Sequence, residues 1–258
     1  MPEAPSGRRP YMVGNWKMHK TIVEARAYVE ELLSSLGAAG GHVDVGVCPP
    51  YTALAAAVDG FDGTGVRVFA QNMSAARDGA ETGEVSAPML LELGVAGVVL
   101  GHSERRRDQG ETDRALGEKV LAALDAGLEP ILCVGETEQE RDGGEMQRRL
   151  RHQVQEGLDQ VPPERLGEVT IAYEPVWAIG TDRSATPEQA QEAIAFVRAL
   201  VGDRSEEAAE RVRVLYGGSV KPDNAADIFS QPDVDGALVG GASLEAADFA
   251  ELVAAAAG

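Results

Sequence analysis

Residues 169–181 read Val-Thr-Ile-Ala-Tyr-Glu-Pro-Val-Trp-Ala-Ile-Gly-Thr. The first five residues are β-branched, aromatic or small and apolar for the most part, which predicts a short strand. The strand is expected to end at Glu174, so an ionisable side chain stands directly at the end of a buried run. The same combination, a strand with polar residues at its end, recurs along the chain and is the basis of the predicted fold.

Similar runs occur along the whole chain and give eight candidate strands in all. The other seven are Tyr11–Gly14, Val43–Cys48, Val66–Ala70, Gly97–Leu100, Ile131–Val134, Val212–Tyr216 and Ala237–Val239. Between most of them lie helical patterns rich in Ala, Leu and Glu. One covers residues 21–36, and another covers 188–201 and is opened by Thr186 as N-cap and Pro187 in the first turn.

Strands that alternate with helices predict parallel strands joined by helical crossovers. Eight such units in about 250 residues fit a single (β/α)8 barrel of the TIM type, with outer helices, better than an open doubly wound sheet. No G-x-G-x-x-G follows the first strand, which weakens a dinucleotide-binding interpretation. No Pro/Ser-rich linker divides the chain, so we predict one catalytic domain over residues 10–258, preceded by a disordered tail over residues 1–9.

The composition limits the possible partners. Asp and Glu number 42 against 23 Lys and Arg, a formal net charge of −19. This charge disfavours nucleic acid, and the absence of an apolar run of about 20 residues disfavours a membrane segment. The acidic surface is interpreted either as a solubilised surface or as an adaptation to high salt. An N-terminus without an apolar stretch, together with Cys48 and Cys133 in strand-like runs, favours a reduced cytoplasmic protein.

Polar and glycine residues gather where the predicted strands end. In a barrel of parallel strands these ends share one rim, which is where chemistry takes place. The residues there are Asn15–Lys17, Cys48–Pro50, Gln71–Asn72, Gly101–Glu104, Gly135–Glu136, Glu174–Pro175, Gly217–Ser219 and Gly240–Gly241. We therefore expect the active site at this rim.

Five strings closely resemble the triosephosphate isomerase family, in the family's order and spacing, from about residue 11 to 250. They are Asn15–Met18, Gly101–Arg106, Ala172–Thr181, Tyr216–Val220 and Leu238–Ser243. The resemblance implies interconversion of dihydroxyacetone phosphate and glyceraldehyde 3-phosphate through an enediolate, a step of glycolysis and gluconeogenesis. It also implies that no cofactor is used.

The resemblance assigns five residues to the chemistry. Glu174 is the expected base, and its apolar surroundings would make it a stronger base once water is excluded. His102 is the expected electrophile, kept neutral by the start of a short helix at residues 103–105, as established for this family. Lys17 supplies positive charge, Asn15 a hydrogen bond to the reacting end, and Glu104 orients Lys17 or relays a proton.

A second group of residues is expected to bind the phosphate. Glycine lets backbone N–H groups approach an anion closely, because it has no Cβ. The expected substrate-binding residues are Gly180, Ser219, Leu238, Gly240 and Gly241. No metal site is expected, because the histidines are scattered without ligand spacing: His19, His42, His102 and His152.

Two segments depart from the family pattern. Asp182 and Arg183 stand where the lid segment usually reads Gly-Lys, which bears on lid kinetics. Glu81 stands where the loop 72–86 usually carries an apolar residue. The resemblance implies a homodimer through this loop, with Thr82 supporting the partner's active site, and a buried carboxylate at Glu81 would need a partner.

Two other functions remain open from the sequence. Another phosphate-binding barrel enzyme, such as an aldolase or a phosphosugar isomerase, is one. A Schiff-base aldolase needs a lysine at an inner strand position, whereas Glu174 occupies the end of its strand. The second is a non-catalytic barrel kept for binding or assembly. Such a protein is expected to have lost one of Asn15, Lys17, His102 or Glu174, but all four are present.

Overall fold

The computed structural model describes residues 7–37, 41–179 and 183–258, and in them eight parallel strands form a closed barrel in chain order. The strands are β1 (Tyr11–Asn15), β2 (Asp44–Cys48), β3 (Arg67–Ala70), β4 (Gly97–Leu100), β5 (Glu129–Val134), β6 (Thr170–Tyr173), β7 (Val214–Tyr216) and β8 (Gly236–Val239). β1 pairs with both β2 and β8, which closes the barrel. The predicted (β/α)8 barrel is confirmed, with strand boundaries that differ from the prediction by one or two residues.

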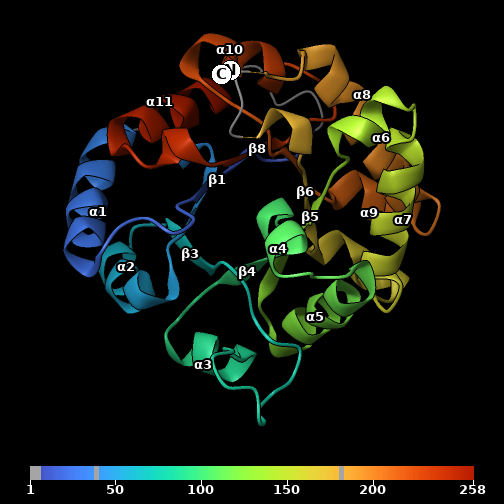
Figure 1. Ribbon diagram of the computed structural model, residues 1–258. Coiled ribbons are helices and arrows are strands. Elements are labelled where there is room, and N and C mark those ends of the chain that lie inside the picture. Colours follow the sequence, from blue (N-terminus) through green and yellow to red (C-terminus); the bar gives the residue numbers. More distant parts are fainter. Residues whose placement is uncertain (1–6, 38–40, 180–182) are drawn as a thin grey trace.

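Helices follow the strands and surround the barrel (Figure 1). They are α1 (Ile22–Leu36), α2 (Leu54–Phe61), α3 (Ala87–Glu92), α4 (Ser103–Asp108), α5 (Asp113–Ala126), α6 (Glu138–Asp142), α7 (Met146–Leu158), α8 (Pro187–Gly202), α9 (Glu206–Arg211), α10 (Pro222–Phe229) and α11 (Ala246–Ala256). Thr21 and Thr186 cap α1 and α8 through capping boxes, and the cap at Thr186 is the one that the sequence predicts. No helix in the described part of the chain is long and apolar enough to cross a membrane.

The interior of the barrel is filled by side chains. Phe69 lies across it, and Gly46 and Gly97 on the neighbouring strands make room: a Cβ on Gly97 would lie 2.4 Å from the Phe69 ring. The residues packed inside include Tyr11, Val13, Cys48, Val99, Ile131, Cys133, Ala172, Leu215 and Leu238. A larger apolar layer lies between the barrel and its helices. The strand ends are therefore held on a rigid scaffold.

The start of the described chain is tied to the barrel. Arg8 pairs with the buried Asp235 at 2.7 Å, and Arg9 pairs with Asp44 at 2.9 Å. Of the tail predicted over residues 1–9, residues 1–6 lie outside the described part of the chain.

The segment between β3 and α3 projects away from the barrel (Figure 1). Its base is closed by the backbone bond from Ser74 N–H to the Val85 carbonyl, at 2.8 Å. Thr82 is exposed in the turn at residues 82–83. Glu81 is exposed as well and accepts a 2.5 Å hydrogen bond from the Ser74 hydroxyl, so its carboxylate has a partner inside the same loop.

Candidate active site

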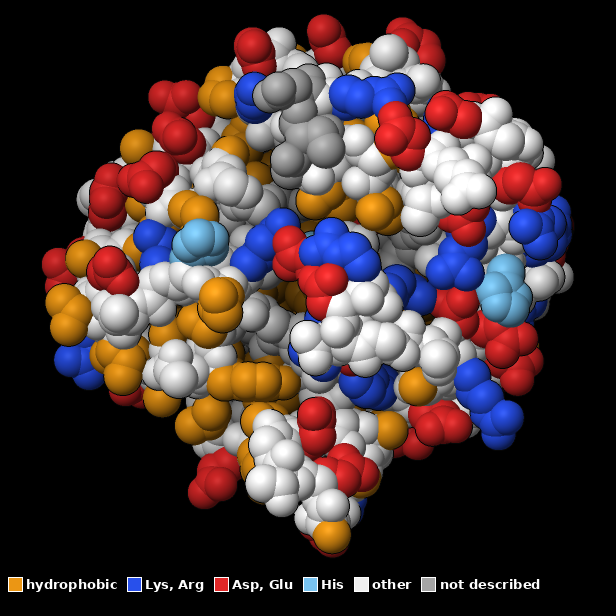
Figure 2. All heavy atoms as spheres, in the orientation of Figure 1, with side chains coloured by type: hydrophobic (Ala, Val, Ile, Leu, Met, Phe, Trp, Pro, Cys, Tyr) orange, Lys and Arg blue, Asp and Glu red, His pale blue; other side chains and the backbone are white. Residues whose placement is uncertain are grey.

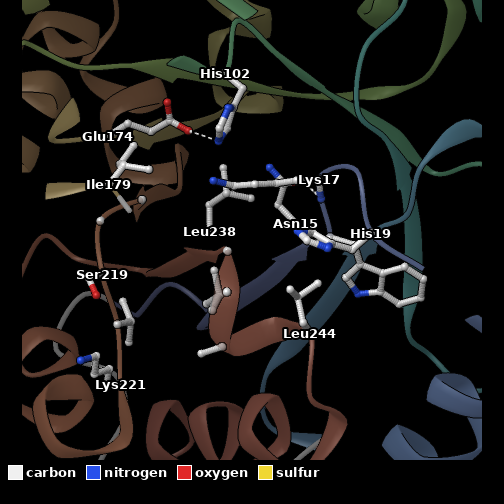
Figure 3. Close-up of a pocket in the computed structure, with 18 residues that line it drawn as sticks. Asn15, Lys17, His19, His102, Glu174, Ile179, Ser219, Lys221, Leu238 and Leu244 are labelled. Atoms are coloured by element: carbon white, nitrogen blue, oxygen red, sulfur yellow. Dashed lines mark hydrogen bonds and ion pairs between the residues drawn. The ribbon is translucent and has the colours of Figure 1, made fainter. Parts of the chain in front are cut away.

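A cavity of about 390 Å³ opens at the carboxyl ends of the barrel strands. The loops after β1, β4, β6, β7 and β8 form its wall (Figure 3). Eight of the predicted site residues line it: Asn15, Lys17, His102, Glu174, Ser219, Leu238, Gly240 and Gly241. Barrel closure therefore brings together residues that are spread over most of the sequence.

Glu174 lies directly after β6 and only 2 % of its surface is exposed. One carboxylate oxygen, Oε2, accepts a 2.8 Å hydrogen bond from the Ser103 backbone N–H. The other, Oε1, lies 3.2 Å from His102 Nε2 and receives no hydrogen bond from any described residue. Figure 3 shows the two side chains facing one another. A buried carboxylate with one free oxygen is suited to accept a proton.

Gly217 makes room for that carboxylate. A Cβ at this position would lie 2.8 Å from Glu174 Cγ and 3.1 Å from the Tyr173 carbonyl oxygen. Any larger residue after β7 would therefore displace the Glu174 side chain.

His102 is the N-cap of α4, the short helix that its sequence predicts. Its Nδ1 accepts a 3.3 Å hydrogen bond from the Glu104 backbone N–H. A nitrogen that accepts carries no proton, so the proton of the neutral imidazole is on Nε2. His102 Nε2 lies 3.2 Å from Glu174 Oε1 without a hydrogen bond between the two, so its N–H can donate to an oxygen bound in the cavity.

Lys17 reaches the cavity from a strained backbone. Its φ of 52° lies in the left-handed region, which non-glycine residues rarely adopt. Asn15 Oδ1 accepts the Lys17 backbone N–H at 3.0 Å, and Gln71 donates to the Lys17 carbonyl at 2.8 Å. Two polar side chains thus fix the turn that aims Lys17, and only the amide nitrogen of Asn15 is left for a ligand.

The ammonium of Lys17 pairs with Glu104 at 2.7 Å. Glu104 lies behind Lys17, in the wall of a second cavity of about 370 Å³. Partial burial is the largest single influence and opposes ionisation of Glu104, but the hydrogen bond from Lys17 and the nearby positive charges together outweigh it and lower the pKa of this carboxyl below its ordinary value. The pair is therefore ionised at neutral pH.

The loops after β7 and β8 present unpaired backbone donors. Among the described residues no acceptor lies within hydrogen-bonding reach of the backbone N–H groups of Ser219, Gly240 and Gly241. A Cβ on Gly240 would lie 3.4 Å from Lys17 Cε, and a Cβ on Gly241 would meet open space. These donors are free to bind an anion.

A fully buried carboxylate supports the segment after β6. Glu136 accepts hydrogen bonds from the Tyr173 hydroxyl at 3.0 Å and from Trp177 Nε1 at 2.8 Å. Arg183 pairs with Glu138 at the start of α6 and lies over the Trp177 ring. Gly180 and Asp182, which figure in the predictions, lie outside the described residues.

The polar residues of the two cavities that the sequence does not mark as site residues include Gln71, His19 and Lys221. Gln71 was noted at a strand end, but its hydrogen bond to Lys17 depends on the barrel bringing β3 beside β1. His19 and Lys221 line the main cavity. Both follow a recognisable strand-end string by one or two residues, and that proximity was the available signal. Thr82, by contrast, is on the projecting loop and not at this cavity.

Thiol and metal chemistry find no support in the described residues. Burial and the neighbouring Glu174 charge raise the pKa of the Cys133 thiol well above its ordinary value, so it stays protonated. Cys48 and Cys133 are both buried and unpaired. Within the described ranges, no group of three or more His, Cys, Asp or Glu side chains is arranged to hold a metal ion.

Comparison with known proteins shows to which family the chain is similar. The family model described as triosephosphate isomerase matches residues 10–256. The chain is 53 % identical over 251 residues to a triosephosphate isomerase of Symbiobacterium thermophilum, covering 97 % of this chain and 98 % of the relative. It is 50 % identical over 247 residues to that of Carboxydothermus hydrogenoformans, covering 95 % and 98 %. With this similarity over nearly its whole length, and a barrel whose strand ends carry the expected side chains, the chain belongs to the triosephosphate isomerase family.

Proposed function

We propose that this protein is a triose-phosphate isomerase that interconverts dihydroxyacetone phosphate and D-glyceraldehyde 3-phosphate. The observation that carries the proposal is the geometry of Glu174: a buried carboxylate with one oxygen held by Ser103 and the other free, 3.2 Å from the imidazole of His102. This pair can remove a proton from carbon while a hydrogen bond stabilises the oxygen beside it.

In the forward step, Glu174 Oε1 takes a proton from the carbon next to the carbonyl. The C–H electron pair forms the carbon–carbon double bond of an enediolate, and the carbonyl oxygen becomes negatively charged. His102 Nε2–H donates to that oxygen, and the neutral imidazole identified by its Nδ1 contact is the form suited to this role. A proton then moves from the neighbouring hydroxyl oxygen to the former carbonyl oxygen, with His102 between the two oxygens. Glu174 returns its proton to the former carbonyl carbon, so that the new carbonyl forms at the neighbouring carbon without a cofactor.

Lys17 stabilises the charge that develops on the enediolate and attracts the phosphate. Its pairing with Glu104 fixes the ammonium rather than leaving it on a freely rotating chain. Asn15 contributes its amide nitrogen to the reacting end. The unpaired N–H groups of Ser219, Gly240 and Gly241 bind the phosphate oxygens, with Leu238 beneath the substrate. Gly180 is proposed as a further phosphate donor.

We also propose a cytoplasmic homodimer, with residues 10–258 as a single catalytic domain. Large exposed apolar side chains support an interface: Met18 and Tyr51, which line the second cavity, are 92 % and 39 % exposed, and Met89 on α3 is 54 % exposed. Exposed side chains of this size are unusual unless a partner covers them. The projecting loop 72–86 would enter the partner's second cavity and bring Thr82 beside the partner's Lys17.

A coupled assay of glyceraldehyde 3-phosphate isomerisation tests the proposed function. Glu174→Gln keeps the shape of the side chain but removes the base, and we expect kcat to fall at least about 100-fold. If the Glu174→Gln variant kept the wild-type kcat, Glu174 would be excluded as the base. An aldolase forming a Schiff base would instead be inactivated by borohydride in the presence of substrate, and we expect no such inactivation.

A further inference from the structure

Lys221 differs from the other lysines in having no partner among the residues that the structure describes. Lys17 pairs with Glu104, Lys119 pairs with Glu111 at 2.7 Å, and Lys20 lies over the Tyr28 ring. The ammonium of Lys221 makes no ion pair or hydrogen bond with any residue that the structure describes. Its side chain is exposed to solvent.

The backbone around Lys221 is fixed even though its side chain is free. Asn224, in the first turn of α10, accepts the Lys221 N–H at 2.8 Å and donates to the Ser219 carbonyl at 3.2 Å. Lys221 is therefore held two residues after Ser219, on the same loop and in the wall of the same cavity. Figure 3 shows Ser219 and Lys221 together on one side of the cavity, away from the Glu174–His102 pair.

The charges at the cavity give this position its significance. Lys17 is neutralised by Glu104, and Glu174 adds a negative charge. Acidic side chains are also spread around the periphery of the face in Figure 2, on a chain with a net charge of −19. Salt screens the distant acids beyond about 8 Å, so the groups beside the cavity decide what an approaching anion experiences. Without Lys221 the side chains of Lys17, Glu104 and Glu174 would carry a net charge of −1, which opposes the attraction of a dianion by the backbone donors.

We propose that Lys221 is a binding residue for the phosphate end of the substrate, where it offsets the dianion's charge beside the backbone donors of Ser219, Gly240 and Gly241. The inference rests on the proposed function only for the identity of the phosphate ester. An exposed ammonium acts as a point charge on a flexible stem, so it favours capture of the anion without constraining the reacting carbons. Its effect therefore falls on substrate binding and not on the proton transfer.

The test compares Lys221→Gln with Lys221→Arg and with Arg26→Gln. Arg26 is exposed on α1, makes no ion pair among the described residues and lines neither cavity, so Arg26→Gln is a control for the loss of one positive charge. At low ionic strength we expect Lys221→Gln to raise KM about 3- to 10-fold with kcat within about twofold of wild type. The increase should shrink at about 0.5 M salt. Lys221→Arg should retain the wild-type KM.

A second readout separates this inference from the proposed function. Inorganic phosphate is titrated into the intact protein and followed by calorimetry, which needs no turnover. Weaker phosphate binding in Lys221→Gln than in Arg26→Gln supports the role of Lys221 even if isomerase activity is absent. Equal phosphate affinities and equal KM values for these two variants would overturn the inference while leaving the proposed function untouched.

Discussion

The carboxylate of Glu104 lies 2.7 Å from the ammonium of Lys17, although 87 residues separate the two in sequence. The pair joins the loop after β1 to the first turn of α4, whose N-cap is His102. One ion pair thus fixes the proposed charge donor relative to the proposed electrophile. Because reactivity is sensitive to such positions, the pair has consequences for turnover as well as for stability.

Replacing Glu104 with Gln should lower kcat by about 10- to 100-fold, because Lys17 loses the charge that holds its ammonium in place. Steady-state kinetics measure this directly. Glu118→Gln is a suitable control, since Glu118 is exposed on α5 and its one ion pair with a described residue is a 3.8 Å contact with Arg114. Equal kcat values in the two variants would show that Lys17 does not depend on its partner.

Gly217→Ala should impair turnover through Glu174. The added Cβ would lie 2.8 Å from Glu174 Cγ, so the carboxylate must move. We expect kcat to fall by at least about 10-fold and the free energy of unfolding to drop by about 1–3 kcal/mol. In Gly202→Ala, on α8, the new Cβ would meet nothing closer than 3.5 Å, and kcat should not change. A fully active Gly217→Ala would mean that Glu174 does not need its present position.

Nitrogen NMR of His102 should report a neutral ring with its proton on Nε2. The reason is the 3.3 Å contact in which Nδ1 accepts the Glu104 backbone N–H. Chemical shifts of the two ring nitrogens distinguish this tautomer from the other. A proton found on Nδ1 at neutral pH would be incompatible with the hydrogen bond at the N-cap of α4.

Glu111 should contribute to the acid sensitivity of the fold. Burial opposes its ionisation, but hydrogen bonds and charge from Lys119 and Arg105 prevail and lower the pKa of Glu111 below its ordinary value. The stabilisation is thus complete above the ordinary pKa of about 4.3 and is lost as the pH falls through the lower folded-state pKa.

The variant Glu111→Gln should lower the free energy of unfolding at pH 7 by about 1–3 kcal/mol. The loss should be smaller at pH 3, which urea unfolding at the two pH values measures. Glu30, exposed on α1 without an ion pair among the described residues, provides the control Glu30→Gln. An identical loss at both pH values would rule out the proposed linkage.

Sedimentation over a dilution series should show a dimer at micromolar concentration. The carboxylate of Glu81 must lose water where the loop 72–86 meets a partner, and its bond from Ser74 compensates only in part. Glu81→Phe should therefore tighten the dimer at least about 10-fold. A protein that stays monomeric at every concentration would refute both expectations.

The sequence alone determined the barrel and the identity of most side chains at its rim. Short apolar strands that alternate with amphipathic helices can pack into only a few folds. Glu174 and His102 each directly follow a strand, which can be recognised from neighbouring residues in the sequence. The N-cap Thr186 is predicted from the sequence for the same reason.

Only the tertiary structure decided how those side chains are held. The Ser103 N–H on Glu174 spans 71 residues and the Gln71 contact with Lys17 spans 54, so neither leaves a local pattern in the sequence. The left-handed backbone of Lys17, the hydrogen bond at His102 Nδ1 and the lack of a partner for the Lys221 ammonium among the described residues likewise depend on which groups become neighbours. Closure of the barrel sets these distances, because it places the ends of strands that are remote in the chain around one cavity.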